Sequence, residues 1–194
     1  MDYEGIKPPF ELEYFSEMNK KQAMQYFQWF METKEERFRV LQEYIFLDTD
    51  KVILDKTPES LIGLWEWFHS KISWEEMTKE EIELELKGRP EWMKQMILLD
   101  TKKIADLTLK LAYDISLYFG EVFVENNVLL YWGVITKPKS LNGVNCPNVL
   151  GFLGDVNMYA YGILQVAIKK EYKETKATRL LDIYNTWLDM NVKN

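Results

Sequence analysis

Apolar side chains recur every three or four residues through most of this chain, and this spacing limits the fold more than any other feature. The clearest example includes Leu111, Ile115, Phe119 and Val122, which follow one face of a helix. Similar faces are found in the segments 16–31, 57–72, 157–172 and 176–190. A chain built mostly from such segments is expected to be mainly helical.

The tetrapeptide TKEE occurs twice, at 33–36 and at 78–81. In each copy the Thr and the second Glu have the spacing of a capping box, in which each side chain bonds the other residue's backbone amide. The first copy is expected to begin a helix that follows a shorter one capped by Ser16. The second copy is expected to begin a short helix that Gly88 closes, because glycine readily adopts the left-handed conformation.

The longest predicted helix begins at Pro90 and ends at about Asn126. Its buried stripe is expected to run from Ile97 to Phe119. Asn126 and Asn127 supply the stop signal, since Asn tolerates left-handed geometry better than most residues.

Gly120 lies inside this predicted helix, where a glycine costs roughly 1 kcal/mol relative to alanine. Close approach of another element would explain its presence. The segment 129–135, which contains Trp132, has strand composition and follows directly. A helix that turns into a strand over a tight contact is therefore favoured over the lip of an active site.

Short runs of β-branched and aromatic residues mark strand candidates at 52–54, 129–135 and 149–153. These are expected to form a small antiparallel sheet of two to four strands beside the helices. The predicted fold class is therefore α+β, with residues 1–194 as one mainly helical domain and residues 1–15 as an N-terminal arm.

The formal net charge of −7 disfavours partners with a negative surface. Nucleic acid and anionic lipid would be repelled, whereas a basic protein would be attracted. The single cysteine, Cys146, excludes a disulfide within the chain and fits a reducing compartment. No signal peptide and no apolar run of about 20 residues is recognised, so a soluble cytoplasmic protein is expected.

Few residues are suited to familiar catalytic chemistry. His69 is the only histidine, so the usual zinc site is excluded, and a Cys146–His69 nucleophile pair would join distant segments. Neither a phosphate-binding loop nor a dinucleotide fingerprint is present. No metal and no cofactor is expected.

Carboxylates on the longest helix allow an alternative. Asp114 and Glu121 are seven residues apart, and Asn126 follows. Such groups could serve a hydrolase or bind a hard cation through oxygen. Glu121 could equally bond a backbone amide or the indole N–H of Trp132, which would make its role structural.

The segment 75–91 is rich in glutamate and is flanked by Trp74 and Trp92. Exposed tryptophan beside acidic residues is a reasonable anchor for a partner protein. The candidate binding residues are Trp74, Glu80, Glu81, Glu83 and Trp92.

Two segments carry a family resemblance: VILDKTPESLIGLWEWF at 52–68 and AYDISLYFGEVFVENNVLLYWGV at 112–134. In this order they resemble uncharacterised bacterial domains, some of which are similar to the immunity proteins encoded beside secreted toxins. The resemblance implies a non-enzymatic protein that neutralises a toxin by binding it, and it transfers no active site.

Three functions therefore remain open from the sequence. The first is a cytoplasmic binding protein with a basic partner. The second is a hydrolase or metal-binding enzyme that uses the carboxylates near Glu121. The third is an assembly protein that forms a homo-oligomer through an apolar patch. A closed seam at Gly120 would favour the first, and an open polar cleft would favour the second.

Overall fold

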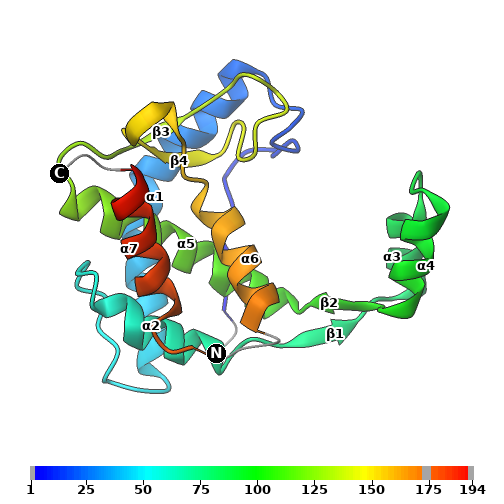
Figure 1. The fold of residues 1–194 in the computed structure, drawn as a ribbon, viewed down its shortest axis with the longest axis horizontal. Coiled ribbons are helices and arrows are strands. Elements are labelled where there is room, and N and C mark those ends of the chain that lie inside the picture. Colours follow the sequence, from blue (N-terminus) through cyan, green and yellow to red (C-terminus); the bar gives the residue numbers. More distant parts are fainter. Residues whose placement is uncertain (1–2, 172–175, 192–194) are drawn as a thin grey trace.

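The computed structural model describes residues 3–171 and 176–191, which form one mainly helical α+β domain (Figure 1). Within these residues there are seven α-helices and two separate two-stranded antiparallel sheets, so the predicted class is confirmed. The elements in chain order are α1 (Lys20–Phe46), α2 (Ser60–His69), β1 (Trp74–Glu76), α3 (Lys79–Leu86), α4 (Glu91–Leu99), β2 (Lys102–Ile104), α5 (Asp106–Asn126), β3 (Tyr131–Val134), β4 (Pro147–Leu150), the 3-10 turn η1 (Leu153–Asp155), α6 (Ala160–Glu171) and α7 (Arg179–Asn191).

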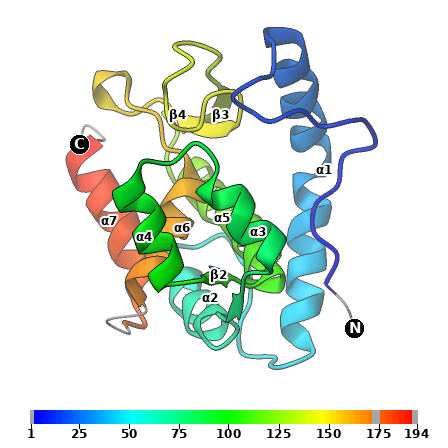
Figure 2. The same ribbon diagram turned by 90° about the vertical axis from the view of Figure 1, so that its right-hand side faces the viewer.

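One part of the chain stands away from the rest. Strands β1 and β2 form a stalk that leaves the body, and α3 and α4 lie at its far end (Figure 1). Figure 2 views the molecule from that end, with α3 and α4 in front of the body. We call residues 74–104 the projection, β1 with β2 its stalk, and α3 with α4 its tip.

Helix α1 is a single helix of 27 residues, so the predicted break at Thr33 is wrong. It begins after Asn19, whose side chain forms a capping box with Gln22, and not after Ser16. The hydroxyl of Thr33 donates to the carbonyl of Trp29 at 2.9 Å. This threonine therefore bonds the preceding turn within a helix instead of capping a new one.

The predicted strand at 52–54 is also wrong, although the segment lies close to a helix. The side-chain amide of Gln42 donates to the carbonyl of Val52 at 2.8 Å and accepts from the N–H of Leu54 at 2.6 Å. A side chain of α1 thus satisfies the backbone groups that a neighbouring strand would have paired.

The long helix predicted from Pro90 is interrupted by strand β2. Helix α4 ends at Leu99, and Asp100 is extended with φ −137° and ψ 95°. Residues 102–104 then pair with residues 74–76 in an antiparallel ladder. This pairing joins segments far apart in the sequence, so the local periodicity did not reveal it.

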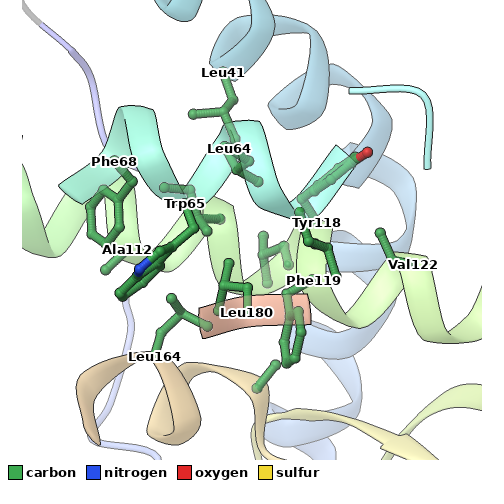
Figure 3. Close-up of a cluster of buried hydrophobic side chains, with 14 of the residues drawn as sticks. Leu41, Leu64, Trp65, Phe68, Ala112, Tyr118, Phe119, Val122, Leu164 and Leu180 are labelled. Atoms are coloured by element: carbon green, nitrogen blue, oxygen red, sulfur yellow. The ribbon is translucent and has the colours of Figure 1, made fainter. Parts of the chain in front are cut away.

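Helix α5 is the centre of the body, and α1 and α6 pack against it. Buried side chains of α2, α5, α6 and α7 meet here, among them Trp65, Phe119, Leu164 and Leu180 (Figure 3). All four have no exposed surface. This core holds α5 in place, and with it the candidate carboxylates.

Strands β3 and β4 form the second sheet. Strand β3 lies within the predicted strand 129–135, whereas β4 begins two residues before the predicted strand 149–153 and ends at Leu150. Trp132 pairs with Val149, and Tyr131 pairs with Leu150. The expected single sheet is in fact two sheets, because β1 and β2 pair only with each other among the described strands. The β3–β4 sheet and α2 lie at opposite ends of the body (Figures 1 and 2).

Candidate functional site

The stalk is held by ladder bonds, ion pairs and bonds at its two ends. The N–H of Ala105 donates to Ser73 at 3.0 Å on the body side, and the N–H of Met77 donates to Thr101 at 2.9 Å on the tip side. Lys103 forms an ion pair with Glu75 on the opposite strand at 3.2 Å. These bonds hold the two strands of the stalk together, and the stalk holds the tip away from the body.

Helix α3 has the predicted capping box and the predicted glycine stop. The N–H of Glu81 donates to the Thr78 hydroxyl at 3.3 Å, and the N–H of Thr78 donates to the Glu81 carboxylate at 2.8 Å. Gly88 has a φ of +73°, the left-handed value expected for a closing glycine. The local prediction for the tip is therefore confirmed at both ends of this helix.

The three candidate glutamates of α3 differ in availability. Glu80 and Glu83 are exposed, and neither forms an ion pair within the described residues. Glu81 instead binds Lys103 of the stalk, and this ion pair lowers the pKa of its carboxyl group. Glu81 thus helps to fix the tip to the stalk, whereas the other two face solvent.

Neither helix of the tip contains a buried residue. Trp92, Met96 and Leu99 of α4 are 61%, 62% and 87% exposed, and their spacing of four and three places them on one helix face. Leu84 of α3 is 72% exposed as well. Exposed apolar side chains collected in this way are typical of an interaction surface.

Trp74 and Trp92 do not belong to one surface. Trp74 is the first residue of the stalk and packs half-buried against the hydrophobic core, whereas Trp92 lies on the tip. Between the tip and the body is a cleft of about 630 Å³, lined by Trp74, Leu99, Asp100, Lys102 and Lys169. Trp74 therefore contributes to the floor of this cleft.

The second candidate site is a closed seam between α5 and β3. The ring of Trp132 covers Gly120 so closely that a Cβ atom there would lie 2.3 Å from the indole. The indole N–H donates to Glu121 at 2.7 Å. Of the two structural roles open for Glu121, the bond to Trp132 is the one found.

Glu121 is also paired with two lysines. Its other carboxylate oxygen lies 2.5 Å from the ammonium of Lys34 and 3.5 Å from that of Lys56. The side-chain amide of Asn126 donates to the backbone carbonyl of Lys56 at 2.8 Å. Lys56 of the loop before α2 thus contacts both Glu121 and Asn126, while Lys34 connects Glu121 with α1.

Asp114 has separate partners two turns earlier on α5. It accepts from the guanidinium of Arg37 at 2.5 and 3.1 Å and from the hydroxyl of Tyr3 at 2.6 Å. Burial, with the adjacent Asp114 charge, raises the pKa of the Tyr3 hydroxyl. Asp114 is fully buried, so its oxygens face these donors and not an open cleft.

His69 and Cys146 lie at different ends of the body. His69 ends α2, whereas Cys146 directly precedes β4 (Figure 1). Burial raises the pKa of the Cys146 thiol to about 11. A neutral, buried thiol is a poor nucleophile. In the described part of the chain, no three His, Cys, Asp or Glu side chains gather in a way that could hold a metal ion.

Sequence reasoning missed the residues that complete both sites. Lys34, Arg37 and Lys56 pair with carboxylates of α5 that are more than 60 residues away, and nothing local predicts this. The stripe at 92, 96 and 99 was visible as an i, i+4, i+7 pattern. Of these three residues only Trp92 is among the predicted binding residues, because the helix was expected to continue into the body with a buried stripe that starts at Ile97.

Comparison of the chain with protein-family models, with curated proteins and with solved structures finds no match. Across the helices that the structure describes, none is long and apolar enough to span a bilayer. The functional interpretation therefore depends on the geometry of the two candidate sites.

Proposed function

We propose that this chain is a non-enzymatic protein that binds another protein through the tip of its projection. One observation carries the proposal: α3 and α4 bury no side chain and yet present Trp92, Met96 and Leu99 to solvent. Hydrophobic side chains on an outlying element suit an anchor for a partner, because they lose water when the partner docks.

The charge of the tip supports a basic partner. Glu80 and Glu83 are exposed on α3, and the whole chain has a net charge of −7. Opposite charge on the partner would raise the association rate, while the apolar stripe would slow dissociation. Glu81 is less available for this role because it is bound to Lys103.

The proposed biological role is neutralisation of the partner by direct contact, in the cytoplasm. The resemblance of segments 52–68 and 112–134 to immunity-like domains supports this role. These segments form α2, α5 and β3 with the chain leading into them, which are parts of the body. The resemblance thus concerns the scaffold, and the tip would supply the specificity for one partner.

The alternative is a hydrolase or metal-binding enzyme that uses carboxylates near Glu121. Its support is weaker, because Asp114 and Glu121 are buried against Arg37 and Lys34. The seam at Gly120 is closed by the ring of Trp132. A seam of this kind favours a structural role for the buried carboxylates.

The test is capture from host lysate with the wild-type chain and two matched variants. Trp92→Ala/Met96→Ala/Leu99→Ala removes the stripe, while Val128→Ala/Leu129→Ala removes exposed apolar surface from the body. The wild-type chain and the body variant should retain the same stoichiometric, salt-sensitive partner, and the stripe variant should lose it. A partner retained equally by all three proteins would exclude the tip.

A further inference from the structure

The apolar stripe of α4 is well suited to pair with itself. Trp92, Met96 and Leu99 cover almost the full length of a nine-residue helix, with Met96 near its middle. The half-buried Met93 and Ile97 lie further round the helix, where α3 packs. The stripe is therefore a separate, uncovered face and not part of the contact within the tip.

We propose that a second copy of this chain covers the stripe, with the two α4 helices antiparallel about a twofold axis. The axis lies beside Met96, so the two Met96 side chains meet and Trp92 of each copy packs over Leu99 of the other. Twofold contacts are self-complementary, and a single stripe suffices to build them. The inference shares with the proposed function only the premise that the tip is a docking surface.

Charge complementarity favours this occupant. The cleft lies beside the end of α4, at Leu99. In the antiparallel arrangement, the start of α4 in one copy lies at the cleft of the other copy. Lys102 and Lys169 line that cleft, and within the part of the chain that the structure describes neither ammonium forms an ion pair. Glu91, at the start of α4, has a side chain that is 77% exposed and only a 3.6 Å contact with Lys94. Glu91 of one copy would therefore meet two unpaired cations of the other.

One like charge lies in the same cleft. The carboxylate of Asp100 accepts from the N–H of Lys102 at 3.3 Å, which turns it toward the stalk. Two lysines against one aspartate leave the cleft positive, so it still attracts Glu91. The exposed glutamates of α3 lie on the other helix of the tip, outside the α4 stripe.

The size of the contact predicts a reversible dimer. Two helices of nine residues and the rim of a cleft make an interface at or below the low end of about 1,200 Å² for specific complexes. The copies would separate at low concentration and expose the tip. The second copy and any other protein that binds the stripe would then compete for one surface.

Sedimentation velocity over a concentration series, from low micromolar to several hundred micromolar, tests the proposal directly. The wild-type chain should shift from the mass of one chain to that of two. Met96→Glu, which places two carboxylates at the axis, should abolish the shift, and Leu84→Glu on the other helix should not. A wild-type chain that remains monomeric throughout, or a Met96→Glu variant that dimerises like wild type, would overturn the proposal.

Charge exchange provides a second readout that does not depend on loss of folding. Glu91→Lys and Lys102→Glu should each weaken dimerisation by about tenfold, as expected for a charge contact worth about 1.4 kcal/mol. The double variant should recover it, because each copy then carries the exchanged pair. Absence of recovery would contradict the antiparallel register.

The same proteins distinguish this inference from the proposed function. A chain that stays monomeric but still captures a lysate partner through the stripe overturns only the dimer. A chain that dimerises through Met96, and whose stripe variant still captures the lysate partner, overturns only the role of the tip in binding that partner.

Discussion

The indole N–H of Trp132 donates to the carboxylate of Glu121 at 2.7 Å, while the ring of the same residue closes over Gly120. One side chain of β3 thus contacts two successive residues of α5. Lys34 of α1 binds the other oxygen of the same carboxylate at 2.5 Å. Three elements from different parts of the chain are therefore joined at Glu121.

Replacement of Glu121 by Gln should lower the free energy of unfolding by about 2 kcal/mol, because Lys34 would lose its buried carboxylate partner and keep only the exposed Glu35. The side chain of Lys34 is only 12% exposed. The bond from Trp132 can be kept by the amide oxygen, so the loss reports the charge pair. Urea unfolding followed by tryptophan fluorescence measures it.

The matched control for that variant is Glu43→Gln. Glu43 pairs with Arg39 on the surface, with side chains that are 60% and 58% exposed. Such pairs contribute less than about 1 kcal/mol. Equal losses for the two variants would contradict a special role for the buried pair.

Gly120→Ala should destabilise the protein by about 1–3 kcal/mol, although alanine is the better helix former. The new Cβ would lie 2.3 Å from the Trp132 ring. Gly63 of α2 is a matched control, since its Cβ would meet only a Val52 methyl at 3.5 Å. Gly63→Ala should be neutral or stabilising by up to about 1 kcal/mol. Thermal unfolding of both variants decides whether the close contact is the cause.

Local features of this seam could be predicted from the sequence, and its long-range partners could not. Gly120 interrupts a helical pattern at a known cost, so a close contact was a sound expectation. Asn126 does end α5, although Asn127 is extended with φ −142° and not left-handed. Lys34 and Lys56 reach Glu121 only because α1 and the loop before α2 pack beside α5. No periodicity carries that information.

In the projection, too, local features could be predicted from the sequence and the long-range pairing could not. Capping residues predicted α3, and Pro90 marked the start of α4. The stalk depends on pairing between residues 74–76 and 102–104, and strands of three residues leave almost no pattern. Without the stalk, α4 was joined to α5, and Ile97 was placed at the start of a buried stripe. The missed strand thus concealed that Met96 and Leu99 share one exposed face with Trp92.

Deprotonation of Cys146 should reduce stability only in alkaline solution. Burial raises the pKa of its thiol from 9.0 to about 11. Well below pH 9 the thiol is protonated in both states and stability is unaffected. Between pH 9 and 11 the unfolded state loses the proton first, so stability falls. The free energy of unfolding is measured against pH for wild type and for Cys146→Ala. The difference between the two slopes is the contribution of the Cys146 thiol. An equal slope in both proteins would contradict the raised pKa.

Charge reversal on the tip should change the kinetics of partner binding without changing the fold. Glu80→Lys/Glu83→Lys should slow association by about tenfold at low salt and flatten its salt dependence, while dissociation changes little. Stopped-flow mixing with the captured partner at several ionic strengths measures both rates. Glu43→Lys, on α1, supplies a control with a single exposed reversal. An unchanged association rate would remove α3 from the binding surface.

The two TKEE segments allow one sequence to be compared in two structural settings. Thr78 caps α3, whereas Thr33 lies inside α1 with its hydroxyl bonded to the Trp29 carbonyl. Loss of a cap costs about 1 kcal/mol. Thr78→Ala should therefore increase hydrogen exchange in α3 about fivefold, because the tip opens locally and has no core of its own.

Thr33→Ala should leave exchange in α1 unchanged or slower, since alanine favours the helix interior more than threonine does. Amide exchange followed by mass spectrometry reads both helices in one experiment. The assignment of the two segments would be reversed if Thr33→Ala made exchange in α1 faster and Thr78→Ala left exchange in α3 unchanged. The expected result would show that the capping box predicted at Thr33 does not begin a helix, which agrees with the start of α1 after Asn19.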